Sequence, residues 1–281
     1  MSTTPNTDTN ADNYVVAHAT NLLADDVHVF EHSVAIARAA DSPIYTLHAV
    51  DNKHGTLEMP EVEPLLARWG GKDVSHHRVR HKCCEDTIDT LLDGLRLIEP
   101  DLLVVGKNQG EGLSFILEES VSEAIARNIH IPTLVLPTKS SGFVNPRNGA
   151  IKLERVLIPA EDEETFLLAL RHTMRLLDKV EMTNVQITAL HIGKDIEGES
   201  LVLPEDPNIK IDVKLIEGNL VDSIVDVAAE GRFDMITMAT RGHDSLLDVA
   251  RGSHTERVLR NTNVPVMVIP VHASHAHFGL F

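Results

Sequence analysis

Apolar residues occur along this chain in short runs that alternate with segments of helical spacing. The short runs predict five strands in the first half: Tyr14–Ala17, Pro43–Val50, Val74–His81, Leu102–Val105 and Thr133–Leu136. Helical spacing predicts three helices between them: Val27–Ala40, Thr87–Ile98 and Ser120–Asn128.

The same order returns in the second half. The predicted strands there are Val156–Ile158, Val185–Ile192, Ile209–Ile216, Met235–Met238 and Val266–Ile269. The predicted helices are Thr165–Leu177, Leu220–Glu230 and Ser253–Asn261. Strand–helix alternation with apolar strands indicates an α/β fold, in which doubly wound parallel sheets carry helices on both faces.

The two halves are also similar in sequence. Residues 101–137 align without a gap to residues 234–270, at one constant offset of 133 residues, and nine positions are identical. A period this long indicates duplication of a whole domain rather than a solenoid repeat. The first half has a segment, Met59–Trp69, that lacks a counterpart in the second, where Gly193–Asn208 is a loop rich in acidic residues and proline.

These patterns predict the domain organisation. Residues 1–12 are polar and are expected to be a disordered tail. Domains are expected at 13–138 and 151–271, joined by a linker at 139–150 that is rich in Gly, Pro and Asn, and residues 272–281 form a tail that contains histidine.

Composition narrows the functional classes. The net charge of −17 disfavours general binding to nucleic acid. The chain has no signal-peptide pattern and no apolar run of the roughly 18–20 residues that a membrane span needs. Its two cysteines are adjacent, which disfavours an ordinary disulfide and favours a reducing cytoplasm.

A candidate phosphate-binding loop follows the fourth strand of the second half. It begins with Ala239-Thr240-Arg241-Gly242, continues for nine residues, and ends with Gly252-Ser253 before a helix. Glycine lets backbone amides approach an anion, and the start of a helix offers unpaired N–H groups. Arg241, His243, Arg251 and His254 lie within this segment, against the carboxylates of Asp244 and Asp248. Ser253 with Glu256 also forms a capping box, so the serine alone could simply begin the helix.

The equivalent loop of the first half lacks the two glycines of the candidate phosphate-binding loop. Gln109 stands where the second half has Gly242, and Glu119 stands where it has Gly252. Two carboxylates, Glu118 and Glu119, suit the helix dipole but repel a phosphate. We therefore expect the first half to be a degenerate copy.

At these residues the chain resembles a tandem universal stress protein with two UspA-type domains, a Rossmann-like, adenine-nucleotide α-hydrolase-like fold. The family motif Gly-x2-Gly-x9-Gly-Ser/Thr is matched as Ala239-x2-Gly242-x9-Gly252-Ser253. The first strand of family members ends in an aspartate that contacts adenosine, and here Glu161 stands at that position. In the first half, the segment Val15–Ala19 is expected to put an alanine there.

The resemblance implies that the second domain binds ATP, AMP or ADP, with Mg²⁺ beside a triphosphate. The implied site comprises Pro159, Ala160, Glu161, Ile192, Met238, Ala239, Thr240, Arg241, Gly242, His243, Gly252, Ser253 and His254. It also implies that the two closing strands, Thr133–Leu136 and Val266–Ile269, pair within one chain as they pair two subunits of single-domain relatives. Further homodimerisation is compatible with this arrangement.

Histidines form other candidate sites. His76, His77, His81, Cys83 and Cys84 could bind a metal, but solvated histidines on an edge strand are the simpler interpretation because no Cys-x2-Cys pair is present. The two cysteines could also be a redox pair. His272, His275 and His277 lie in the expected tail. His48 and His191 end equivalent strands, which favours shared packing over catalysis.

The predicted function is a nucleotide-dependent sensor or adaptor in a stress response, with an unidentified protein partner. The chain lacks a P-loop, a kinase catalytic loop, a nucleophile elbow and a His-Glu-x2-His pair, so no catalytic residue is predicted. Two alternatives stay open: a nucleotide-free interaction scaffold, and a slow ATPase.

Overall fold

The computed structural model describes residues 14–20, 22, 26–50, 58–82, 87–107, 131–137, 140–160, 162–193, 203–204, 206–240 and 254–271. In the first half the strands are β1 (Val16–Ala19), β2 (Ile44–Val50), β3 (His76–Lys82), β4 (Leu102–Lys107) and β5 (Thr133–Pro137). The helices there are α1 (Val27–Ala39), α2 (Glu63–Trp69) and α3 (Thr87–Ile98).

The second half follows the same order. Its strands are β6 (Arg155–Ala160), β7 (Val185–Ile192), β8 (Ile209–Ile216), β9 (Met235–Thr240) and β10 (Val266–Pro270). Its helices are α5 (Glu163–Lys179), α6 (Leu220–Glu230) and α8 (His254–Asn261). The predicted helix Ser120–Asn128 lies outside the described residues, and α2 is an element that the hydrophobic pattern did not predict.

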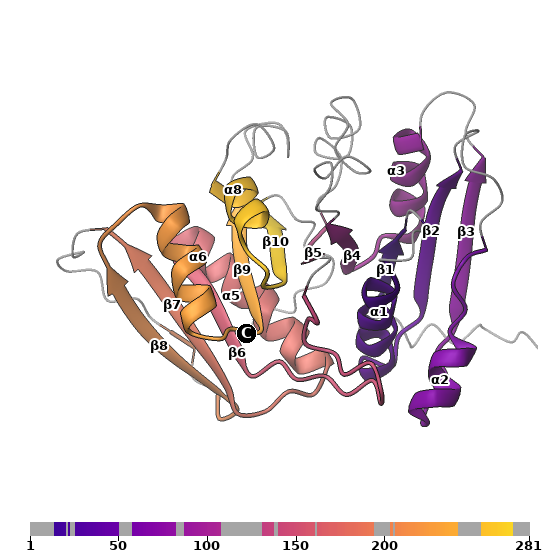
Figure 1. Ribbon diagram of the computed structural model, residues 1–281, viewed down its shortest axis with the longest axis horizontal. Coiled ribbons are helices and arrows are strands. Elements are labelled where there is room, and N and C mark those ends of the chain that lie inside the picture. Colours follow the sequence, from indigo (N-terminus) through magenta and orange to yellow (C-terminus); the bar gives the residue numbers. More distant parts are fainter. Residues whose placement is uncertain are drawn as a thin grey trace, which may run out of the picture.

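All ten strands form one continuous sheet in the order β3-β2-β1-β4-β5-β10-β9-β6-β7-β8 (Figure 1). Neighbouring strands within each half are parallel, as predicted. The halves meet where β5 pairs antiparallel with β10, with Val135 opposite Val266. The expected pairing of the two closing strands is therefore confirmed.

Helices cover both faces of this sheet. One hydrophobic cluster packs α1 and α5 against one face, with Phe30 and Phe166 among its buried members. A second cluster packs α3, α6 and α8 against the other face, and Leu92, Ile224 and Val258 belong to it. This is the layered α/β architecture that the apolar strands predicted.

Side chains also connect the two halves. The Arg175 guanidinium in α5 bonds Asp101 Oδ1 at 2.6 Å and lies over the ring of Tyr14. Burial raises the pKa of Tyr14, and Asp101 raises it further. Lys107 at the end of β4 donates to the Leu259 carbonyl in α8, and burial lowers its pKa, with Arg260 acting in the same direction.

The segment predicted as a linker packs against the first half. His32 Nε2 in α1 accepts hydrogen bonds from the amides of Phe143 (3.0 Å) and Val144 (3.2 Å). The Trp69 indole N–H donates to the Pro146 carbonyl, and Arg38 donates to the Gly149 carbonyl. Residues 140–150 are thus fixed by specific contacts to α1 and α2.

Candidate functional site

The strand order of the second half reverses between β6 and β9. The chain passes from β6 outward to β7 and β8 on one side, while β9 and β10 lie on the other. In open α/β sheets a crevice forms at the carboxyl ends of the strands at this reversal, and ligands bind in it. Ala160 and Thr240, the last residues of β6 and β9, lie at this point.

The ladder between β6 and β9 ends early. Its register covers only Val156↔Met235 and Leu157↔Ile236, although both strands continue for three or more residues. The next rung would need an N–H at Pro159, aimed at the Thr237 carbonyl, and proline has no N–H. Pro159 therefore cannot donate a backbone hydrogen bond to β9, and this position is called the open rung between β6 and β9.

The first half differs at the equivalent rung. The repeat aligns Leu102 with Met235. Val16 pairs with Leu102, and Val156 pairs with Met235, so Val16 corresponds to Val156. Three residues further along each strand, Ala19 therefore corresponds to Pro159. Ala19 has an N–H, and the β1–β4 ladder runs on to the pair Ala19↔Val105. Of the two equivalent rungs in the described strands, only the one in the second half therefore lacks an N–H donor.

The residues around the open rung are small. Ala160, Ala239 and Thr240 are half-buried, and Met238 is buried beside them. His191, the residue before the last in β7, pairs with Ala160, and its Nδ1 donates to the Ala160 carbonyl at 3.2 Å. The strand ends at the reversal thus carry small side chains at Ala160, Ala239 and Thr240.

The next helix begins close to the predicted phosphate position. Helix α8 starts at His254, directly after Ser253, and His254 is exposed. At the other end of the predicted site, the Asp162 carboxylate caps α5 by accepting from the Thr165 amide at 3.0 Å. Because Asp162 is used as a helix cap, Glu161 is the carboxylate of this pair that stays a candidate for ligand binding.

The structure brings together part of the predicted site. Seven of its members are described, and they lie at the carboxyl ends of β6, β7 and β9 or at the start of α8: Pro159, Ala160, Ile192, Met238, Ala239, Thr240 and His254. The other six lie outside the described residues: Glu161, Arg241, Gly242, His243, Gly252 and Ser253. Their roles stay predictions.

The register also corrects one comparison between the halves. Because Val16 corresponds to Val156, the counterpart of Glu161 is Asn21, not the alanine that the segment Val15–Ala19 was expected to supply. The sequence pattern alone does not give the cross-strand partners that fix the register of the two strands. Asn21 itself lies outside the described residues.

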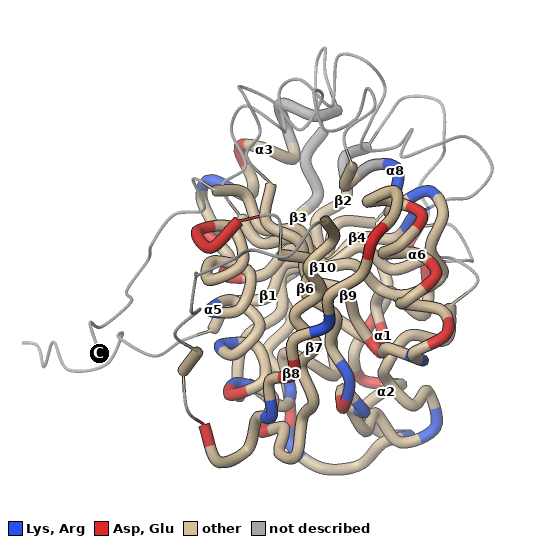
Figure 2. The backbone as a smooth tube through the Cα atoms, turned by 90° about the vertical axis from the view of Figure 1, so that its left-hand side faces the viewer, with Lys and Arg blue, Asp and Glu red and all other residues tan. Residues whose placement is uncertain are grey.

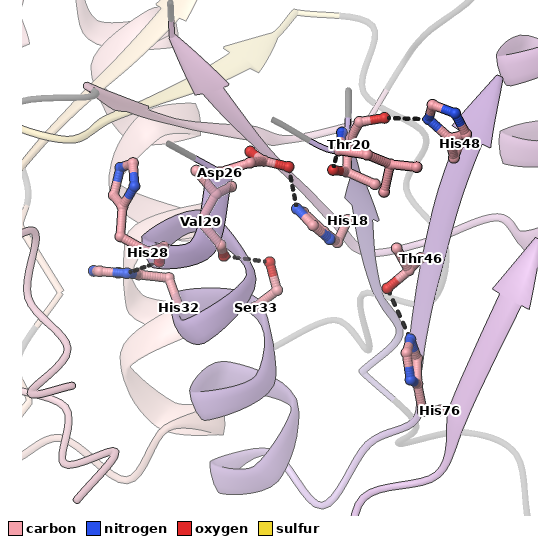
Figure 3. A network of polar contacts seen from close by, with 11 residues as sticks. His18, Thr20, Asp26, His28, Val29, His32, Ser33, Thr46, His48 and His76 are labelled. Atoms are coloured by element: carbon pink, nitrogen blue, oxygen red, sulfur yellow. Dashed lines mark hydrogen bonds and ion pairs between the residues drawn. The ribbon is translucent and has the colours of Figure 1, made fainter. Parts of the chain in front are cut away.

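A buried polar pair occupies the first half near the same point. His18 corresponds to Ile158 of the second half and is fully buried. Its Nε2 lies 3.4 Å from Asp26 Oδ2, and neither ring nitrogen has a hydrogen-bond partner within the described ranges (Figure 3). The sequence pattern did not predict this pair, although a histidine inside an otherwise apolar strand is a signal of a buried polar group.

The histidines at strand ends make equivalent bonds. His48 Nδ1 donates to the Thr20 carbonyl at 2.9 Å, as His191 does to Ala160, and Thr20 corresponds to Ala160 in the register above. Each bond fixes the ring against the end of the neighbouring strand. This agrees with the expectation that their recurrence reflects shared structure.

The described histidines of the candidate metal cluster on β3 contact different partners. The His76 ring packs near Phe30 and bonds Thr46 Oγ1 at 2.9 Å, whereas His77 stacks on Tyr45. Burial lowers the pKa of His76 to about 4, with Arg78 contributing. Among the described residues no group of three or more His, Cys, Asp or Glu could hold a metal ion. Cys83 and Cys84 lie outside them, as do His272, His275 and His277.

Comparison with known proteins relates the second half to one family. The universal stress protein family model matches residues 194–270. Universal stress protein MJ0531 of Methanocaldococcus jannaschii is 23% identical over 145 residues, which is 44% of this chain and 85% of that protein. Universal stress protein Slr1230 of Synechocystis is 32% identical over 63 residues, 22% of each protein.

Solved structures share the whole fold. A universal stress protein from Archaeoglobus fulgidus has a TM-score of 0.64 at 17% identity, covering 91% of this chain and 96% of its own. A functionally unknown protein, PA1789 from Pseudomonas aeruginosa, has a TM-score of 0.56 at 14% identity, covering 92% and 93%. The fold of universal stress proteins is thus shown over nearly the full chain. Within the described residues, no helix has the length and apolar character needed to cross a bilayer.

Proposed function

We propose that this chain is a tandem universal stress protein whose second half binds an adenine nucleotide, ATP in the first instance. Binding would make it a sensor or adaptor in a cytoplasmic stress response, without catalysis. The observation that carries the proposal is the open rung between β6 and β9, because in sequence β9 is followed by the predicted glycine-containing phosphate loop and then by α8.

The described residues fit a nucleotide at this point. Ala160 and Ala239 put small, half-buried side chains at the ends of β6 and β9, and in the proposal the buried Met238 offers an apolar contact for a base. The start of α8 offers the N–H groups that phosphate groups bind in many proteins. In the proposal, Glu161 and Ile192 border the adenosine, and the backbone from Ala239 to His243 and from Gly252 to His254 holds the phosphates.

The charge of the protein makes local donors necessary. A net charge of −17 repels a polyphosphate at long range, so affinity must come from short-range groups. The amides of the loop and the cations Arg241 and His243 meet this need, and Mg²⁺ bound to the triphosphate would lower its charge.

A pair of exchanges between the halves tests the proposal. Gly252→Glu copies the residue of the first half and puts a carboxylate beside the phosphates. We expect ATP affinity, measured by calorimetry with Mg²⁺, to fall by roughly 100-fold or more, about 2.7 kcal/mol. Glu119→Gly, the reverse exchange, is the matched control and should leave the affinity and the stoichiometry of one ATP per chain unchanged.

Other outcomes identify the alternatives. The chain has one Trp and two Tyr, so nucleotide that co-purifies should be obvious in the ultraviolet spectrum. A protein that carries no nucleotide and gains no thermal stability from ATP with Mg²⁺ would be an interaction scaffold. Phosphate release that Gly252→Glu abolishes would indicate a slow ATPase. An unchanged ATP affinity in Gly252→Glu would contradict the proposed nucleotide site.

A further inference from the structure

Strand β8 forms one outer edge of the sheet. It has eight residues and is the last strand in the order, paired on one side with β7. No further described element lies beyond it in Figure 1. Val213 and Leu215 leave 64% and 47% of their surface exposed, which is unusual for large apolar residues placed side by side on one strand face.

The hydrogen bonds to β7 show which backbone groups of β8 face outward. The Val185 amide donates to the Asn208 carbonyl, and the Gly193 amide donates to the Ile216 carbonyl, so even-numbered residues of β8 face β7. In a parallel ladder this parity alternates along the strand. The N–H and C=O groups of Ile211, Val213 and Leu215 therefore point to the free edge.

This edge is complementary to itself. In an antiparallel pair with Val213 opposite Val213 of a second copy, Ile211 stands opposite Leu215, and all these residues face the partner with their free backbone groups. The alternate positions place Asp212 opposite Lys214. Those positions form the closer, non-hydrogen-bonded pairs, where opposite charges stabilise and like charges destabilise.

We propose that two copies of this chain associate through β8, antiparallel, with the two-fold axis beside Val213. Four features support this one register: outward-facing backbone groups, apolar residues on one face, opposite charges on the other face, and the position of β8 as the last of the described strands. Figure 2 looks on to this edge from outside the sheet. Because the contact is two-fold, it closes after two copies instead of growing into a fibre.

The opposite edge of the sheet lacks this complementarity. Strand β3 reads HHRVRHK, which is basic and has no acidic residue. Arg78 in this strand is bonded to Glu61 of the segment before α2. Self-pairing of β3 would place cations opposite cations, and pairing of β3 with β8 would also join two strands of net positive charge. Association is thus directed to β8 with β8.

Proline at position 213 tests the backbone pairing. The Val213 amide points outward, so Val213→Pro removes a donor of the new interface and no hydrogen bond to β7. At about 100 µM, because an edge pairing has a small interface, we expect light scattering to give twice the chain mass of 30.9 kDa for the natural protein. Val213→Pro should give the mass of one chain, and Val213→Ile, which keeps the N–H, should stay dimeric.

A charge exchange tests the register. Asp212→Lys alone puts cations opposite each other at two symmetric places and should weaken the dimer by roughly tenfold. Lys214→Asp alone should do the same with anions, and the double variant should restore the dimer. Asp212 also bonds Gln186 and Lys210, so thermal unfolding of each variant checks that the fold is kept. A monomeric natural protein, or a dimer that Val213→Pro leaves intact, would overturn the proposal.

Discussion

His18 and Ile158 occupy the same position of two similar strands, yet only one of them is ionisable. The second half fills the position with an apolar side chain in the core. The first half puts a fully buried imidazole there, 3.4 Å from the Asp26 carboxylate. Single substitutions inside one shared fold therefore give the two halves different local chemistry at the point where the strand order reverses.

His32 is a second buried histidine, and its bonding predicts how stability depends on pH. Its Nδ1 donates to the His28 carbonyl, while Nε2 accepts from the amides of Phe143 and Val144. A proton on Nε2 would remove both accepted bonds. Burial lowers the pKa of His32 to about 4, and the His28 carbonyl opposes this in part.

The sign of the effect follows from this lowered pKa. Since the unfolded chain takes up a proton near pH 6.5 and the folded chain only near pH 4, stability is full above pH 6.5 and falls as the pH drops toward 4. The loss from His32 is on the order of 3 kcal/mol. We expect urea unfolding to show it, and His32→Gln, which keeps an acceptor but does not titrate, should have a flatter profile. Equal slopes for both proteins would contradict this role.

The sequence predicted the kinds of residues at the site better than their partners. It ended the strand at Ile158, two residues before the observed end at Ala160, and began the helix at Ser253, one residue before the observed start at His254. It assigned the counterpart of Glu161 wrongly, since letters do not reveal cross-strand register. The contacts of His18 and His32 could not be predicted, because their partners are distant in sequence or belong to backbone groups.

At the scale of elements, the strands were the most predictable part. Short, β-branched apolar runs bounded by turns gave the bounds of β7 and β8 without error. Helical spacing did the same for α6. Helix α2 was missed because it has only seven residues and begins with proline at its first turn. Such a short helix depends on tertiary contacts, here Trp69 with the 140–150 segment.

Pro159 links strand structure to the proposed function. Pro159→Ala supplies an N–H that can donate to the Thr237 carbonyl, as Ala19 can to Val104 in the first half. We expect the β6–β9 ladder to extend and ATP affinity to fall by about tenfold, or about 1.4 kcal/mol. Calorimetry with ATP and Mg²⁺ measures this directly.

The reverse substitution is the control for Pro159→Ala. Ala19→Pro removes an N–H from the β1–β4 ladder and should cost on the order of 1 to 3 kcal/mol of folding stability, read from urea unfolding, without changing ATP affinity. If Pro159→Ala leaves the ATP affinity unchanged, the open rung does not contribute to ligand binding.

At the scale of the whole molecule, two similar halves form one sheet and differ at their strand reversals. The β5–β10 pair, the Arg175–Asp101 ion pair and the docked 140–150 segment connect them. The repeat with its offset of 133 residues predicted the duplication, and the family resemblance predicted the pairing of the closing strands that the structure shows. Neither could predict how residues 140–150 pack, since polar loops carry no periodic signal.

The most direct measurement of the central claim is a crystal structure of the full chain soaked with ATP and Mg²⁺. The account predicts one nucleotide per chain, at the carboxyl ends of β6 and β9, with its phosphates at the start of α8. Electron density for a nucleotide at the ends of β1 and β4 alone, beside His18 and Asp26, would contradict it.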